Sequence, residues 1–95
     1  MTYLVLNDVV RNSSSNIEGE KLFILLQAAL EKKQKTILCV GNQDSLSSSF
    51  LNSSIGLYLD NYGLKKFKNN ISFKGNKNQF SRLSRYISLY SEAHL

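Results

Sequence analysis

Hydroxyl side chains are concentrated in one stretch of the sequence, where six serines occupy the ten positions from Ser45 to Ser54. A serine directly before a helix accepts a hydrogen bond from one of the first backbone N–H groups, so Ser47, Ser48 or Ser49 is expected to cap a helix that begins here. One cap is sufficient, which leaves other hydroxyls available for phosphorylation. A phosphate adds about two negative charges, and the positive end of the helix macrodipole would stabilise them. The stretch therefore predicts a helix start that is also a candidate switch.

The elements on either side decide where these serines lie. The run from Thr36 to Val40 is short, apolar and closed by Gly41, which is typical of a buried strand. After the serines a helical stripe runs up to Gly63, a position typical of the left-handed glycine that ends a helix. Gly56, inside this helix, is expected to allow close packing against the sheet. The residues of the stripe are Leu51, Ile55, Tyr58, Leu59 and Tyr62. The serines thus follow the carboxyl end of a strand, where open α/β sheets place functional groups.

The rest of the chain repeats the alternation of strands and helices. A β-branched and aromatic segment from Tyr3 to Val10 predicts the first strand, and an apolar stripe that begins after Glu18 predicts the first helix. Residues 69–75 alternate as a short strand, and residues 77–92 carry a last helical stripe. Because no proline, repeat or linker interrupts the chain, residues 1–95 are expected to form a single domain in the order β-α-β-α-β-α. We expect an α/β fold with amphipathic helices packed on a small parallel or mixed sheet.

The serine-rich segment also resembles a known signature. TILCVGNQDSLSSSFLNSSIGLYL is similar to the strand–loop–helix segment of STAS domains, the family of anti-sigma factor antagonists, in which an Asp-Ser-Ser-Gly stretch precedes the helix. Ser48 and Ser49 match the two serines, whereas Ser47 replaces the Asp and Phe50 the Gly. The segments LSSSFLNSSIG and YGLKKFKNNISFKG resemble more closely still the STAS-like family DUF4325, and the resemblance spans most of residues 3–75. It implies a STAS-like fold with a small mixed sheet.

The resemblance carries an expectation about function. In the anti-sigma factor antagonists the first serine of the pair is phosphorylated by a histidine-kinase-like ATPase, and Ser48 is the matching position. This implies a regulatory protein-interaction module that is not an enzyme, with such an ATPase or another regulator as its partner. The contact surface would be the loop and helix start from Asp44 to Phe50 together with the exposed side of the following helix. The residues expected to bind the partner are Asp44, Ser47, Ser48, Ser49 and Asn52.

The charge of the chain supports an alternative. Residues 1–60 have a net charge of −1, from five basic and six acidic side chains, whereas residues 61–95 have a net charge of +6, from seven basic side chains and Glu92. Such asymmetry indicates an acidic partner, either a protein or a nucleic acid, although solvated surface lysines give the same composition. In the nucleic-acid interpretation Tyr86 and Tyr90 are available for base stacking beside a basic patch. The patch would consist of Lys65, Lys66, Lys68, Arg82 and Arg85.

Other classes of function lack their residues in this sequence. Cys39 and His94, each the only one of its type, make no metal cluster, and no catalytic pair, phosphate loop or dinucleotide fingerprint is recognisable. We therefore expect no cofactor, no metal and no catalytic residue. No apolar run approaches the ~18 residues of a membrane span, and the N-terminus lacks the basic region of a signal peptide. A cytoplasmic protein without a membrane partner is expected.

The predicted closing helix is more apolar than one buried face requires. Its surplus could form a homodimer interface. The apolar and aromatic residues of this helix are Phe80, Leu83, Tyr86, Ile87, Leu89 and Tyr90.

Overall fold

The computed structural model of the chain describes residues 1–12, 14–41 and 46–93. Its strands and helices follow one another in the predicted order, with short helical segments added after the first strand and at the start of the second long helix. The elements are β1 (Thr2–Val5), α1 (Leu6–Val9), α2 (Asn16–Glu31), β2 (Thr36–Cys39), α3 (Ser48–Leu51), the π-helical η1 (Asn52–Gly56), α4 (Leu57–Asn70), β3 (Ile71–Lys74) and α5 (Lys77–Ala93).

The described strands form one parallel sheet in the order β1-β2-β3. Tyr3 pairs with Ile37, and Leu38 pairs with Phe73, so the three strands are in register along their whole length. This confirms the predicted α/β fold and its order of elements. The sheet is parallel throughout these strands, where the family resemblance implied a mixed sheet, because each strand is followed by a helix that returns the chain to the same end of the sheet.

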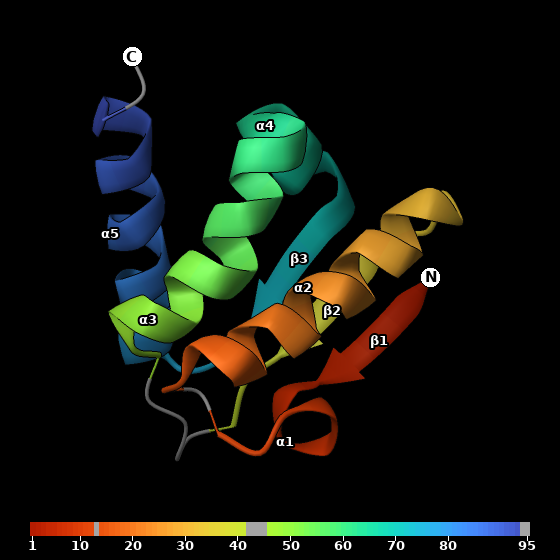
Figure 1. The fold of residues 1–95 in the computed structure, drawn as a ribbon, viewed down its shortest axis with the longest axis horizontal. Coiled ribbons are helices and arrows are strands. Elements are labelled where there is room, and N and C mark those ends of the chain that lie inside the picture. Colours follow the sequence, from red (N-terminus) through yellow and green to blue (C-terminus); the bar gives the residue numbers. More distant parts are fainter. Residues whose placement is uncertain (13, 42–45, 94–95) are drawn as a thin grey trace.

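In the part of the chain that the structure describes, the helices cover one face of the sheet. Both crossovers step in the same direction, from β1 to β2 and from β2 to β3, and right-handed crossovers in one direction place their helices on the same side. Figure 1 shows α2 and α4 together over this covered face, with α5 beside α4. The alternation of burial along the strands agrees with this, since Thr36 and Leu38 are buried whereas Tyr3 is exposed.

The first strand is shorter than the sequence predicts. The prediction of a strand from Tyr3 to Val10 is correct only as far as Val5, because the next four residues form the helical turn α1. Asn7 and Asp8 explain the difference, since both residue types are disfavoured in strands.

The helix that follows the serines is continuous but irregular. Ser47 is its N-cap, and α3, η1 and α4 then continue with right-handed helical backbone at their junctions. Gly63 interrupts it with φ of +88°, a value that favours glycine, so the predicted helix end is present there. A second helical segment nevertheless follows up to Asn70, which the sequence analysis did not predict.

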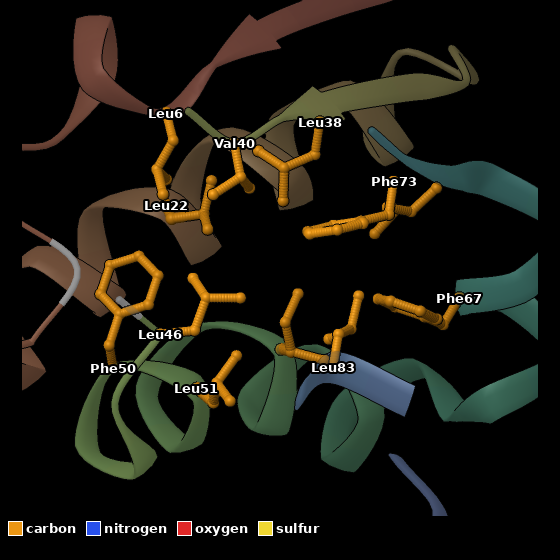
Figure 2. A pocket seen from close by; sticks show the side chains of 12 residues that line it. Leu6, Leu22, Leu38, Val40, Leu46, Phe50, Leu51, Phe67, Phe73 and Leu83 are labelled. Atoms are coloured by element: carbon orange, nitrogen blue, oxygen red, sulfur yellow. The ribbon is translucent and has the colours of Figure 1, made fainter. Parts of the chain in front are cut away.

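The core lies between the helices and the covered face of the sheet. Figure 2 shows side chains from the strand side, such as Leu38 and Phe73, directed toward side chains from the helices, such as Phe50 and Leu83. The cavity that they leave is about 10 Å³, close to the smallest volume that holds one water molecule. Since its lining is apolar and its volume is so small, this space offers no site for a small-molecule ligand.

Tyr58 is the exception within this core. Its side chain is fully buried against the rings of Tyr62 and Phe67, at centroid distances of 5.1 and 5.9 Å, and among the described residues its hydroxyl has no hydrogen-bond partner. Burial also raises the pKa of this hydroxyl. An unpaired buried hydroxyl is destabilising, so Tyr58→Phe should increase the free energy of unfolding by about 1–2 kcal/mol in chemical denaturation. A decrease would show that the hydroxyl binds internal water.

Candidate functional site

The predicted switch serines lie at the carboxyl edge of the sheet. The α3 helix starts there after β2, and α5 starts there after β3. Ser47 accepts a hydrogen bond from the backbone N–H of Phe50 at 3.1 Å, so the predicted cap is confirmed and Ser47 is the serine that makes it. Ser49 is exposed, and its carbonyl oxygen accepts from the hydroxyl of Ser53.

Ser48 differs from its neighbours in having a cation at its hydroxyl. The side chain is exposed, in the first turn of the helix, and its Oγ accepts a hydrogen bond from Nη2 of Arg82 at 2.9 Å. The guanidinium is itself held in place, because its Nε donates to the carbonyl oxygen of Leu46 at 3.0 Å. A group added to this hydroxyl would therefore meet a positioned arginine.

The N-terminal part of α5 holds both ends of the loop that precedes Ser48. Gln79 is buried and donates from Nε2 to the carbonyl oxygen of Gly41, at the end of β2, while Arg82 holds Leu46 at the other end. Gln79 also forms a reciprocal cap with Asn76 at 2.9 and 3.0 Å, which orients the start of α5. Asp44, one of the predicted partner-binding residues, lies outside the described residues.

Further along α5 two tyrosines continue these contacts. Tyr86 donates to Oδ1 of Asn52 at 2.7 Å, and Tyr90 donates to Oδ1 of Asp60 at 2.5 Å. These residues are spaced by four or eight along their helices, so each set lies on one helix face. We call the three contacts of α5 with Ser48, Asn52 and Asp60 the polar seam. It joins α5 by side-chain hydrogen bonds to Ser48 and Asn52, which are two of the predicted site residues, and to Asp60.

Gly56, at the end of η1, packs closely against α5 and not against the sheet. A Cβ at Gly56 would lie 2.5 Å from Oη of Tyr86. The expectation that Gly56 allows close packing against the sheet is therefore wrong, since the close neighbour is the tyrosine ring of α5.

The contact between Tyr90 and Asp60 has a measurable consequence. The hydrogen bond to Asp60, together with burial, raises the pKa of Tyr90 to about 12. Because the folded-state pKa lies above the unfolded value, this contribution to stability is complete below pH ~10 and is lost as the pH rises toward 12. Replacing Asp60 with Asn should return the titration of Tyr90 toward its usual pH, which the ring resonances of the five tyrosines in an NMR titration would resolve. An unchanged titration would contradict this hydrogen bond.

The start of α2 packs closely against the same helix. A Cβ on Gly19 would collide with Oγ of Ser53 and with the carbonyl oxygen of Phe50, so glycine is required for this approach. Glu18 beside it is buried, pairs with Lys21 at 2.7 Å and accepts from the backbone N–H of Arg11 at 2.5 Å. These contacts, with Lys21 first, lower the pKa of Glu18. Its carboxylate therefore supports the packing of α2 and is not poised for proton transfer.

The five residues of the predicted basic patch do not form one surface. The lysines lie on the second segment of α4, just before β3 begins at the amino edge of the sheet. Arg82 lies at the opposite edge and is engaged with Leu46 and Ser48, and Arg85 follows it on α5. The lysines are Lys65, Lys66 and Lys68.

Residues 1–12, 14–41 and 46–93 contain no group of three metal-ligating side chains. No helix in these ranges is long and apolar enough to span a membrane. Cys39 is a free cysteine in β2, and its side chain is half-buried.

The polar seam was missed by the sequence analysis. The sequence places Arg82 in a basic patch and offers Tyr86 and Tyr90 for base stacking. It does not indicate that these three side chains form hydrogen bonds with the continuous helix of α3, η1 and α4. The available signal was the spacing of four residues between successive long polar side chains on α5, matched by the same spacing from Ser48 to Asn52.

The fold defines a small α/β domain with a three-stranded parallel sheet and a serine-rich helix start at the carboxyl edge of that sheet. The chain matches the family described as the STAS-like domain of unknown function, DUF4325, over residues 18–79. As this range covers more than half of the chain, the chain belongs to that family, and the resemblance noted in the sequence is confirmed. Neither a curated protein nor a solved structure is significantly similar to it.

Proposed function

We propose that this domain is a non-enzymatic, cytoplasmic regulatory module that binds a protein partner through the helix start at Ser47–Phe50 and is switched by phosphorylation of Ser48. The partner class is a histidine-kinase-like ATPase or another regulator, as in the anti-sigma factor antagonists that the sequence resembles. The observation that carries the proposal is the hydrogen bond from Arg82 to Oγ of Ser48.

The physical argument rests on charge. A phosphate on Ser48 would bring about two negative charges and three strong acceptor oxygens to a positioned guanidinium. The same charges would face the first, unpaired N–H groups of the helix that Ser47 caps. Both effects favour the phosphorylated form in the folded state, so phosphorylation would change the surface without unfolding the domain. Ser49 is also exposed, but the hydrogen bond from Arg82 is made to Ser48 and not to Ser49, which makes Ser49 the matched control.

The proposal is tested by partner capture from the native host. Wild type, Ser48→Glu and Ser49→Glu are used as baits, and wild type purified with phosphatase inhibitors is mapped for phosphopeptides. We expect phosphate on Ser48, and a protein that distinguishes wild type from Ser48→Glu but treats Ser49→Glu as wild type. If no phosphate is found on Ser48 and the three baits retain the same proteins, the proposal is wrong.

Nucleic-acid binding has less support, because the lysines and the arginines of the predicted patch lie at opposite edges of the sheet. A mobility-shift assay at low salt tests this alternative, and we expect no salt-dependent complex.

Homodimerisation through α5 stays a prediction. Phe80 and Leu89 are exposed on this helix, and light scattering at several concentrations tests it.

A further inference from the structure

No helix of residues 1–12, 14–41 and 46–93 covers the second face of the sheet. Strand alternation places on it every second residue of each strand, and we call this surface the open face. Its residues are Tyr3, Val5, Ile37, Cys39, Ser72 and Lys74. Tyr3 is 59% exposed and Val5 38%, while Ile37 and Cys39 in the middle strand are half-buried. The open face is thus apolar on β1 and β2 and polar on β3.

This arrangement is unusual for parallel strands. Parallel sheets are normally covered by helices on both faces, because both faces of their strands are apolar. The described elements place their helices on one face, yet Tyr3, Val5 and Ile37 on the other face are residues suited to a covered face. Covering them would contribute favourable free energy in proportion to the apolar area removed from water.

The charge around the open face has one sign. Lys74 lies on it, and Lys35, two residues before Ile37 in the same extended segment, belongs to the same side. The acidic residues whose side chains the structure describes lie elsewhere, in the helical elements α1, α2 and α4, and Glu92 belongs to α5. A second copy of the chain would bring lysines against lysines without a compensating carboxylate. An occupant with acidic residues beside an apolar stripe would complement the surface.

The size of the open face suits a single helix. Three strands of four residues extend roughly 13 Å along the chain and roughly 10–15 Å across it. A helix has a diameter of about 10 Å, so one helix of about three turns would fill this area. A stable interface between two globular surfaces needs about 800 Å² from each partner, which is far more than the open face offers.

We propose that the open face is a docking surface for an amphipathic helix of a partner protein, with an apolar stripe that packs on Tyr3, Val5 and Ile37 and with Asp or Glu beside the stripe facing Lys35 and Lys74. This helix would supply the second layer that the two crossovers leave out. The surface is separate from Ser48 and does not rest on the function proposed for it.

The experiment is a selection from a phage library that displays a small helical-bundle scaffold with one randomised helix face. The full chain is the target. We expect the selected faces to share an apolar stripe at helical spacing flanked by Asp or Glu. Lys74→Glu should weaken these binders about tenfold, and Tyr3→Lys should weaken them at least as much.

Ile24→Lys is the matched control, because Ile24 is 60% exposed, as Tyr3 is, but lies on α2 in the helical layer. It should leave the selected affinities unchanged, and circular dichroism should confirm that all three variants fold. The proposal is overturned by an absence of binders, by basic selected faces, or by binders that respond to Ile24→Lys and not to Tyr3→Lys. A concentration-dependent dimer that Tyr3→Lys dissociates would also overturn it, since the occupant would then be a second copy.

Discussion

Phosphorylation of Ser48 should raise the midpoint of thermal unfolding by about 5 °C or more, and Arg82→Gln should remove most of that gain. The reason is that a phosphate turns the neutral hydrogen bond between Ser48 and Arg82 into a charge-assisted one, of a kind that contributes about 1.5–3 kcal/mol. In a domain of this length each kcal/mol shifts the midpoint by about 4–8 °C. Phosphoserine introduced biosynthetically at position 48, in wild type and in Arg82→Gln, would provide the four proteins of a double-mutant cycle.

Phosphoserine at position 49 is the control for this cycle. It would carry the same charge on the same helix turn, but Arg82 contacts Ser48 and not Ser49. We expect its effect to be smaller and insensitive to Arg82→Gln, because only the interaction with the helix end would remain. Equal stabilisation at both positions, or a coupling energy near zero, would show that Arg82 does not receive the phosphate.

Leu83→Ala should be the most destabilising substitution in α5, with a loss of about 2–5 kcal/mol of unfolding free energy. Leu83 is the buried apolar residue of this helix, and its side chain projects into the core beside Phe67 and Phe73. Tyr86, Ile87 and Tyr90 of α5 are only partly buried against the core, and the hydrogen bonds of the polar seam lie close to solvent. Loss of Leu83 should therefore release α5 before the rest of the domain unfolds.

Amide hydrogen exchange distinguishes this local opening from global destabilisation. In Leu83→Ala the amides of α5 should exchange much faster than in wild type, while those of β2 should keep higher protection. Phe80→Ala is the matched control, because Phe80 is 56% exposed on the same helix and should change little beyond its contact with Phe73. A uniform loss of protection in α5 and β2 would mean that α5 is an integral part of one cooperative unit.

The features that the sequence predicted correctly depend on residues that are close to one another along the chain. The apolar stripe from Leu51 to Tyr62 and the cap at Ser47 depend on contacts within one or two helical turns, and both are confirmed. The same holds for the closing helix, predicted over residues 77–92 and observed over Lys77–Ala93.

The features that the sequence did not predict depend on contacts between residues distant in sequence or on competing local preferences. Nothing near Arg82 indicates that it will reach Leu46 and Ser48, and Arg82 also lies outside the residues that match the family. The turn at Leu6–Val9 was missed because the apolar residues around it gave it the composition of a strand. The helix beyond Gly63 is not predicted because a glycine after an apolar stripe is typical of a helix end, whereas here the chain returns to helical backbone after it.

Gln79 and Arg82 of α5 form hydrogen bonds with Gly41 and Leu46, the residues at the two ends of the loop. Binding of a ligand to the loop and release of α5 are therefore thermodynamically linked. If a ligand of the loop binds more tightly once α5 is released, then release of α5 must be favoured by the same factor when that ligand is bound. A partner that pulls Gly41 and Leu46 away from α5 would work against these two hydrogen bonds, and a partner that binds while both hydrogen bonds are kept would stabilise the position of α5. The mobility of α5 therefore reports which kind of partner has bound at the loop that its first turns hold.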